Sequence, residues 1–88
     1  MEVKFYSSAL KHTGGTVSVL IEPDSCPDLQ SLISALGTRF GREFAGLLLG
    51  GETWLVLVNG KAVSATGGLN TLLTEDDIIE ILPIIGAG

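Results

Sequence analysis

The residues with the most distinctive chemistry stand at the C-terminal end of the chain. Residues 83–88 read Pro-Ile-Ile-Gly-Ala-Gly and end in a glycine carboxylate. Proline has no N–H for a sheet ladder, so we expect the five residues after Pro83 to project from the fold. Extended, they reach roughly 17 Å, and their small last residues would fit a narrow tunnel in another protein. The ionised carboxylate can attack the α-phosphate of ATP held by a partner.

An alternative for these five residues is a frayed terminus, which most domains have. Ile84 and Ile85 argue against this alternative, because a segment that is only solvated has no reason to be so apolar. The tail alone does not decide between the two interpretations.

Side chains elsewhere do not assemble into a familiar catalytic site. His12 and Cys26 are the only residues of their kinds, so we expect no metal site and no bound cofactor. Cys26 lies at an expected helix start, where the helix dipole could lower its pKa, but an incidental free thiol is the simpler interpretation. The adjacent acids of residues 75–77 indicate a solvated turn rather than an acid–base pair. The sequence therefore predicts no self-contained active site.

Length and composition indicate one small domain that works with a protein partner. The 88 residues are 45% hydrophobic, and the apolar runs are far shorter than the ~20 residues of a membrane helix. The N-terminus begins with strand-like alternation instead of a signal peptide, which favours a cytoplasmic location. A net charge of −5 repels nucleic acids and favours a partner with a basic surface.

Alternation of apolar and polar residues predicts the strands that must position the tail. Two of them cover residues 3–6 and 16–22, joined through a tight reversal at residues 12–15. Trp54 to Val58 is apolar almost throughout, as in a strand buried on both faces or central in a sheet. The Asn59-Gly60 pair after it predicts a hairpin to a return strand at residues 61–63.

A last strand, Ile78 to Leu82, follows an acidic turn at residues 74–77 and leads into the tail. A helix is predicted between the second and third strands, because apolar residues recur at i, i+3, i+4, i+7 and i+11 from Leu29 to Phe40. Ser25 and Asp28 resemble a capping box at its start, and Gly41 is the expected stop.

Two features near this helix have no single interpretation. Gly37, inside the helix, marks either a close approach to the sheet or an early helix end. Residues 42–53 give only a weak periodic signal, so we expect an irregular connection to the third strand.

With these elements in order, the chain resembles the ubiquitin-like sulfur carriers of the MoaD and ThiS group over essentially all 88 residues. The resemblance rests on the opening Val-Lys-Phe-Tyr strand, the Asp28-Leu29 helix start, the hairpin at residues 57–61, the segment 74–83 and the glycine-terminated tail. It implies an α+β fold, the β-grasp, in which a mixed sheet holds one main helix across its face. We expect this domain to cover residues 1–83 and a flexible tail to cover residues 84–88.

By the same resemblance, an enzyme like the ubiquitin-activating enzymes uses ATP to adenylate Gly88, and a sulfur donor converts the acyl-adenylate to a thiocarboxylate. In the molybdopterin-synthase branch, the carrier is the small subunit, and its tail enters the large subunit to deliver sulfur to a pterin precursor. Ile85, Gly86 and Ala87 would line that insertion. The length of the connection at residues 42–53 favours this branch over the thiamine-pathway carriers.

Phe5, Trp54 and Ile81 would contribute to an apolar docking face for such a partner, with packing in the core as the alternative. Relatives of this kind usually end in Gly-Gly after a Pro-Pro step, whereas this chain has Ile84 and Ala87 at two of those places. The methyl group of alanine disfavours positive φ by roughly 1–2 kcal/mol. Where a partner's tunnel needs glycine, activation would slow about tenfold or more.

Three alternatives to the molybdopterin role stay open. The chain could be a protein modifier conjugated through Gly88, as ubiquitin is, or a thiamine-pathway sulfur carrier. It could also be a β-grasp binding module whose altered tail has lost its chemistry. Isopeptide-linked adducts that depend on Gly88 would identify the modifier, and partner binding that survives loss of the tail would identify the binding module.

Overall fold

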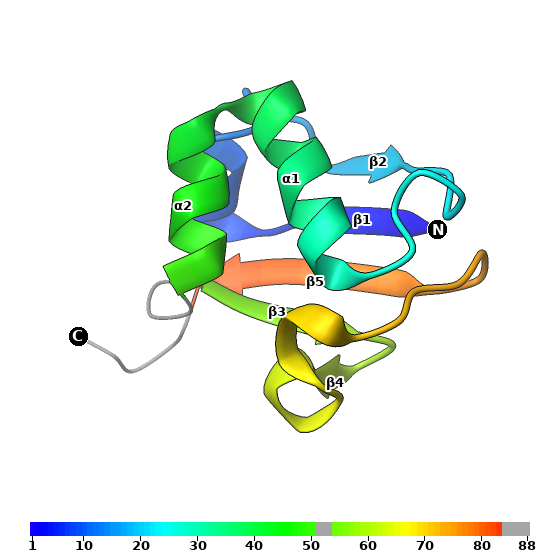
Figure 1. Cartoon of the computed structure of the whole chain (residues 1–88). Coiled ribbons are helices and arrows are strands. Elements are labelled where there is room, and N and C mark those ends of the chain that lie inside the picture. The colour runs from blue at the N-terminus through cyan, green and yellow to red at the C-terminus, as the bar shows by residue number, and fades with distance from the viewer. Residues whose placement is uncertain (51–53, 84–88) are drawn as a thin grey trace.

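The computed structural model describes residues 1–50 and 54–83, and within these ranges five strands form one mixed sheet (Figure 1). The strands are β1 (Glu2–Phe5), β2 (Ser18–Leu20), β3 (Trp54–Val58), β4 (Lys61–Ala62) and β5 (Ile78–Pro83). Their order across the sheet is β2-β1-β5-β3-β4, so the last strand of the chain is the central one. It runs parallel to β1 and antiparallel to β3.

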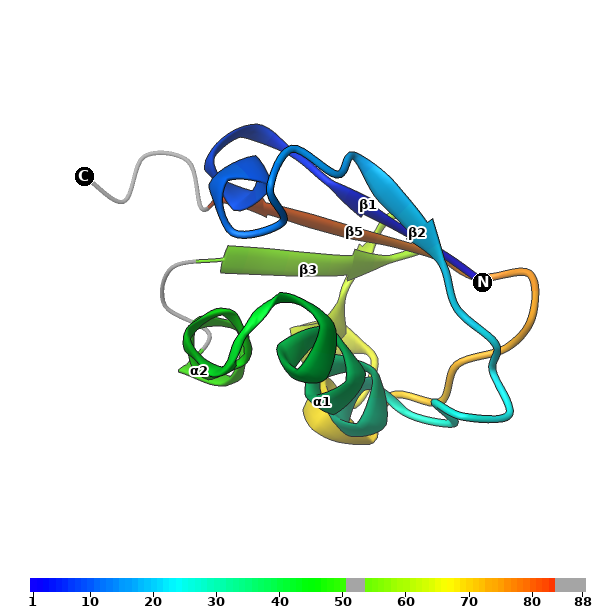
Figure 2. The same cartoon turned by 90° about the horizontal axis from the view of Figure 1, so that it is seen from above.

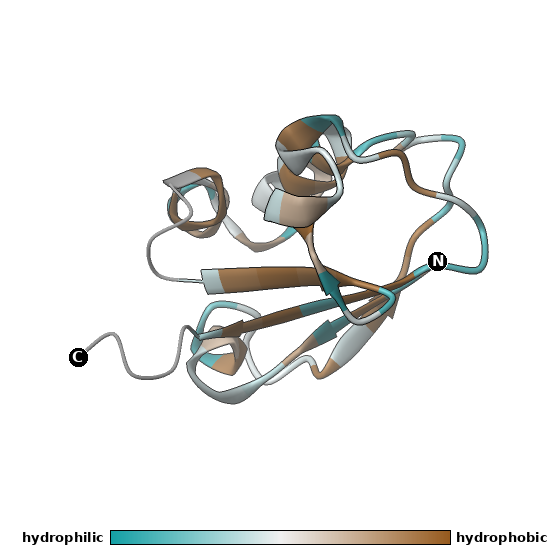
Figure 3. Ribbon diagram, turned by 90° about the horizontal axis from the view of Figure 1, so that it is seen from below, coloured by the Kyte–Doolittle hydropathy of each residue, from teal (hydrophilic) through white to brown (hydrophobic). Residues whose placement is uncertain are grey.

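The alternation in the sequence correctly predicts which segments form the strands, although the bounds of four strands differ. The first strand begins and ends one residue earlier than expected, at Glu2 and Phe5. The second strand is shorter than expected, and the return strand β4 has only two residues because Val63 begins the 3-10 helix η2 (Val63–Ala65). The last strand extends one residue further, to Pro83. Figure 3 shows many hydrophobic residues on the strands, and burial alternates along β1 and β3, as in a sheet with one face in the core.

The predicted hairpin between β3 and β4 is confirmed. Asn59 and Gly60 both have positive φ, at 53° and 84°, as the two central residues of a type I′ turn must. The Asn59 side chain also fixes the start of β5: its Oδ1 accepts from the N–H of Ile78 at 2.9 Å, and its Nδ2 donates to Asp77 at 2.8 Å. Sequence therefore determines both the turn and its link to the central strand.

The main helix α1 (Leu29–Phe40) has the predicted bounds, but its N-cap is Asp28 and not Ser25. Oδ1 of Asp28 accepts from the backbone N–H of Ser31 at 2.8 Å and from its hydroxyl at 2.6 Å. These two hydrogen bonds, the one from the hydroxyl first, hold the pKa of Asp28 below its usual value against a small opposing effect of burial. The helix ends at Gly41, whose φ is 117°.

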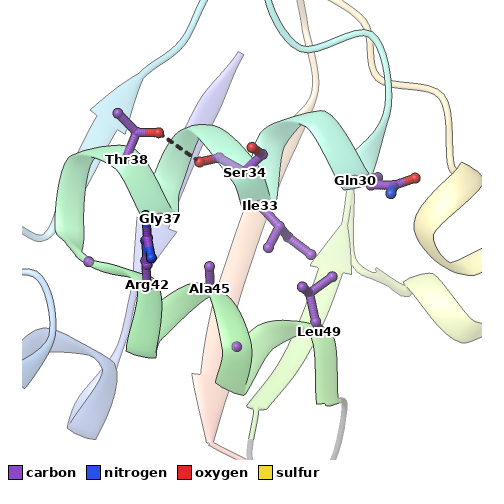
Figure 4. Close-up of a pocket in the computed structure, with 10 residues that line it drawn as sticks. Gln30, Ile33, Ser34, Gly37, Thr38, Arg42, Ala45 and Leu49 are labelled. Atoms are coloured by element: carbon purple, nitrogen blue, oxygen red, sulfur yellow. Dashed lines mark hydrogen bonds between the residues drawn. The ribbon is translucent and has the colours of Figure 1, made fainter.

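The prediction of an irregular connection after Gly41 was wrong over nine residues, which form a second helix, α2 (Arg42–Gly50). This helix packs against α1 where Gly37 faces Ala45 (Figure 4). A Cβ atom on Gly37 would lie 2.7 Å from the Cβ of Ala45. Gly37 therefore marks a close approach to a second helix, instead of to the sheet or an early helix end.

Both helices cover the same face of the sheet (Figures 1 and 2). The core lies between these two layers and contains Val3, Leu32, Leu36 and Ile79, all of which are fully buried. A 3-10 helix, η1 (Ser7–Lys11), follows β1 in place of a simple loop. This 3-10 helix lies beside β5 and packs against it.

Candidate functional site

The tail begins at the C-terminal end of the central strand. Pro83, the last residue of β5, pairs with Trp54, the first residue of β3. The predicted reactive residue Gly88 and the predicted insertion residues Ile85, Gly86 and Ala87 lie outside the described residues, and so does the predicted tail segment as a whole. The structure thus gives the geometry of the tail's base.

Aromatic rings pack tightly beneath this base. The imidazole of His12 stacks on Phe44, with ring centroids 5.3 Å apart and planes 7° from parallel. The Trp54 indole meets His12 edge-on at 5.8 Å and Phe44 at 6.5 Å. Such edge and stacked contacts add about 0.5–1.5 kcal/mol per pair beyond burial of the rings. The last residues of β5 are therefore anchored in a well-packed corner.

The three residues expected to form a docking face lie in the core. Phe5 is 2% exposed, Trp54 5% and Ile81 1%, and all three belong to the sheet face that the helices cover. Their side chains present no surface to a partner in this structure, and core packing, the alternative, describes their positions. These three residues pair with neighbouring strands and do not form an exposed site.

The opposite side of the sheet, here called the outer face, carries the exposed apolar residues that sequence reasoning missed. Leu55 pairs with Leu82, and Leu57 lies two residues along the same face, all three being half-buried. Leu20 on β2 is 81% exposed. Alternation could have identified this face in β5, where the buried residues Ile79 and Ile81 are separated by a polar one. It could not do so in β3, where every residue is apolar.

A single polar pair crosses the outer face near the tail. The hydroxyl of Tyr6 donates to Oε2 of Glu80 at 2.7 Å. This hydrogen bond, helped by slight burial and by the negative charges of Glu80 and Glu2, raises the pKa of Tyr6 above its usual value. The tyrosine therefore stays neutral and keeps its hydroxyl as a donor on a face that carries leucines on β3 and β5 and the charged residues Glu2 and Lys4 on β1.

Cys26 and the acidic turn do not contribute a reactive group. Cys26 is buried at 1% exposure ahead of the helix, and burial, with the nearby charge of Asp28, raises the pKa of its thiol. The expectation that a helix dipole could activate it is wrong for this reason. Asp77 is a structural residue: its carboxylate accepts from the backbone N–H of Thr74 and from the side chain of Asn59.

Within the described parts of the chain, no group of three potential metal-ligating side chains comes together. The helices in those parts are also too short or too polar to span a lipid bilayer. An open groove of about 790 Å³ runs between α1 and α2, where Ile33 and Leu49 point towards each other (Figure 4). Arg42 is the only charged residue that lines it.

Comparison with known proteins identifies the family. The ThiS family model matches residues 3–88, which is nearly the whole chain. The chain belongs to the ThiS family. It is therefore a ubiquitin-like sulfur carrier of the ThiS and MoaD type, as its sequence predicted. None of the curated protein sequences matches it closely enough to count as a relative.

Solved structures show the same fold for this ThiS-family chain. CysO of Mycobacterium tuberculosis is 25% identical, with a TM-score of 0.81 over 96% of this chain and 98% of its own. The BexX/CysO complex of Amycolatopsis orientalis gives 24% identity and a TM-score of 0.76 over 99% and 98%. The small archaeal modifier protein 1 of Methanosarcina acetivorans gives 22% identity and a TM-score of 0.76 over 99% and 94%. The predicted β-grasp fold is thus confirmed.

Proposed function

We propose that this protein carries sulfur as a thiocarboxylate on Gly88. The observation that carries the proposal is the extent of the family match, which runs from residue 3 to Gly88 and so includes the whole tail. A match that ended with the fold at Pro83 would support only a β-grasp domain. Because the match includes the terminal glycine, the chemistry is assigned to its carboxylate and to partner enzymes.

The proposed chemistry has two steps. An oxygen of the Gly88 carboxylate attacks the α-phosphorus of ATP on an enzyme like the ubiquitin-activating enzymes, and pyrophosphate leaves. A sulfur donor then delivers a sulfur nucleophile to the acyl carbon, and AMP leaves with the oxygen that it carried. Adenylation is needed because a carboxylate is a poor electrophile, whereas AMP is a good leaving group. ATP is a substrate of the partner, and we propose no cofactor bound to the carrier itself.

The described residues would present the tail and recognise the partner. Packing of His12, Phe44 and Trp54 holds the end of β5, so the tail starts from a fixed position. The outer face, with Leu55, Leu82 and the Tyr6–Glu80 pair, offers apolar and acidic contacts beside that position. The complex of CysO with BexX in Amycolatopsis orientalis supports the view that such a carrier works in a protein complex.

Molybdopterin or a related pterin cofactor is our first proposal for the fate of the sulfur, with the tail entering the large subunit of a synthase. Its support is the sequence resemblance to the small subunit of that enzyme. The length of the connection at residues 42–53 no longer adds to it, because CysO and the archaeal modifier are matched over 98% and 94% of their own chains. A cytoplasmic location belongs to the same proposal, since adenylation takes place where ATP is available.

The decisive experiment is intact-mass analysis after incubation with ATP, a candidate activating enzyme and a sulfur donor. The full chain should gain the mass of an adenylate and then the mass change of replacing one oxygen by sulfur. A chain that lacks only Gly88 should gain neither. Leu72→Ser is a matched control, because Leu72 is exposed and bridges to Asp28 at the far end of α1 from Gly41. An unmodified full chain with every tested activating enzyme would contradict the proposal.

The fate of the sulfur is tested separately. Transfer to a pterin precursor in the presence of a synthase large subunit would support the molybdopterin role. Transfer only to a thiazole precursor would assign the chain to the thiamine pathway instead. Isopeptide-linked adducts that disappear on deletion of Gly88 would show that the activated carboxyl group is attached to proteins.

A further inference from the structure

A hollow of about 250 Å³, here called the β3 hollow, lies next to the base of the tail. Its walls include Leu29 of α1, Leu48 of α2, Trp54 and Val56 of β3, and Leu69 of the 3-10 helix η3 (Gly68–Asn70). None of its lining side chains is charged. A hollow of this kind can bury further apolar groups, each buried CH₂ contributing about 0.8 kcal/mol.

One wall of the β3 hollow is an unpaired strand edge. The return strand β4 pairs only with Leu57 and Val58, so among the described residues the first three residues of β3 have no strand partner on that side. The N–H and C=O groups of successive residues in a strand point to opposite sides. The N–H of Asn59 donates to β5, so the backbone groups of Val58, one residue earlier, point to β4. Trp54 and Val56 therefore direct their N–H and C=O groups to the open side.

Among the described residues, no hydrogen bond reaches the backbone of Trp54 or Val56 from this side. An edge of this kind accepts an extended segment, which adds to the sheet through main-chain hydrogen bonds. Trp54 also carries the one buried side-chain donor of the described chain that lacks an acceptor, its indole Nε1. Leaving such a group unsatisfied costs about 1–3 kcal/mol. Because Trp54 lines the hollow, its indole N–H signal reports on what occupies it.

We propose that the chain's own tail, residues 84–88, docks in the β3 hollow while no partner is bound. The tail starts at Pro83, which pairs with Trp54, the first residue of the open edge. Passing from β5 to the far side of β3 spans two strand spacings, about 10 Å. The five tail residues reach roughly 17 Å, so residues 84–86 make the crossing, where the side chains of Ile84 and Ile85 come within reach of the hollow beside Trp54, and about two residues are left to lie along the edge. Ile84 and Ile85 are apolar and uncharged, as the lining of the hollow requires.

Attachment makes even weak docking effective. A short flexible connection gives the tail an effective concentration of about 1 mM at the hollow, so an intrinsic dissociation constant near 1 mM gives about half occupancy. The functional consequence rests on the proposed function: Gly88 must leave the hollow before it enters an activating enzyme. The apparent dissociation constant for that enzyme is then the intrinsic one divided by the fraction of chains whose tail is free. At half occupancy of the hollow, the apparent affinity is about twofold weaker.

Trp54 is the only tryptophan, so a ¹H–¹⁵N NMR spectrum contains one indole N–H signal that reports on the hollow. The test compares the full chain with a chain that ends at Pro83, without ATP or any enzyme. We expect the indole signal to shift, and hydrogen exchange at the indole and at the Val56 amide to be about twofold slower in the full chain. A synthetic Ile-Ile-Gly-Ala-Gly peptide at millimolar concentration should restore both effects in the shortened chain.

Two substitutions sharpen this test. Ile85→Ser should remove the protection, because it removes an apolar anchor and keeps the length of the tail. Ile78→Ser, at the opposite end of β5, is the matched control and should leave it unchanged. Deleting Gly88 alone should keep the protection from hydrogen exchange but abolish adenylation at Gly88. A failure of docking can therefore be distinguished from a failure of the sulfur-carrier function.

Identical indole shifts and exchange rates in the full and shortened chains would overturn the proposal. It would equally be overturned if unrelated extended peptides bound the hollow while deletion of the tail changed nothing. That result would assign the open edge of β3 to a strand from a partner protein.

Discussion

The two ends of the central strand β5 are held by different kinds of interaction. At its start, Asn59 and Asp77 form a set of hydrogen bonds that joins the β3–β4 turn to the first residues of β5. At its other end, Pro83 pairs with Trp54, whose ring packs with those of His12 and Phe44. The first end is fixed by polar groups at the surface, and the second by buried apolar area.

This difference suits the tasks of the two ends. Surface hydrogen bonds set the register of the strand but contribute little stability, because water competes for the same groups. Buried rings contribute several kilocalories per mole and leave the surface beside Pro83 free for a partner. The comparison predicts that variants at the tail end change stability most when they touch the rings, and change function alone when they touch the tail.

The largest effect is expected for Phe44→Ala. Phe44 is 1% exposed and contacts His12, Phe5, Phe40 and Trp54, so its removal should lower the free energy of unfolding by about 3–5 kcal/mol. Urea titration followed by circular dichroism measures it.

Leu49→Ala on the same helix is the control, since Leu49 is 52% exposed and should cost far less. Equal losses in the two variants would show that the rings do not anchor the tail end.

An intermediate effect is expected at the start of β5. Asn59→Ala removes two side-chain hydrogen bonds and places a Cβ-bearing residue with no local hydrogen bond at positive φ, which should cost about 2 kcal/mol. Asn59→Gly removes the same bonds without the backbone strain and should cost about half as much. The difference between the two unfolding free energies measures the strain, and identical losses would assign the whole effect to the hydrogen bonds.

A smaller effect, on activity alone, is expected in the tail. Ala87→Gly should raise the rate of ATP-dependent adenylation by up to about tenfold, because glycine adopts positive φ without the penalty of a methyl group. Pyrophosphate release at limiting activating enzyme measures this rate. The unfolding free energy should stay unchanged, and a rate equal to that of the natural chain would show that the partner's tunnel accepts alanine.

The smallest effect concerns pH. Burial acts to raise the pKa of Asp77, but hydrogen bonds from Thr74 and Asn59 and the nearby N-terminal amine outweigh it, so the pKa lies below the usual value. A lowered folded pKa stabilises the protein above the unfolded value of about 3.9, and this contribution is lost as the pH falls through the folded pKa. The stability difference between the natural chain and Asp77→Asn should therefore shrink below pH ~4 in acid titrations. A difference that stays constant there would contradict it.

Much of the fold could be predicted from local patterns, because these patterns and the final packing agree. Alternation in β1 and β5 and the Asn59-Gly60 pair need no tertiary information to be interpreted. The helix α2 does need tertiary information. Its nine residues include Gly46 and are too few to form a stable helix alone, so the helix depends on packing against α1 at Gly37. The 3-10 helix η1 has too few residues to show a period at all.

The candidate site could be predicted from the sequence only in part. The proposed role of Gly88 comes from the resemblance of the whole chain to the family, and it stays a prediction because residues 84–88 lie outside the described residues. The docking residues require the fold, because Trp54 to Val58 is apolar at every position and the sequence does not say which residues face inward. Trp54 proved to be inside, and Leu55 outside.

The central position of β5 also determines how the protein responds to force. Any load applied to Gly88 enters the domain through a strand that is bonded to β1 on one side and to β3 on the other. Ladder hydrogen bonds lie across the strands, so a pull along β5 shears many of them at once instead of opening them one after another. A partner that pulls on the tail therefore loads the sheet in the direction in which it resists force best. The partner should release the carrier before the carrier unfolds.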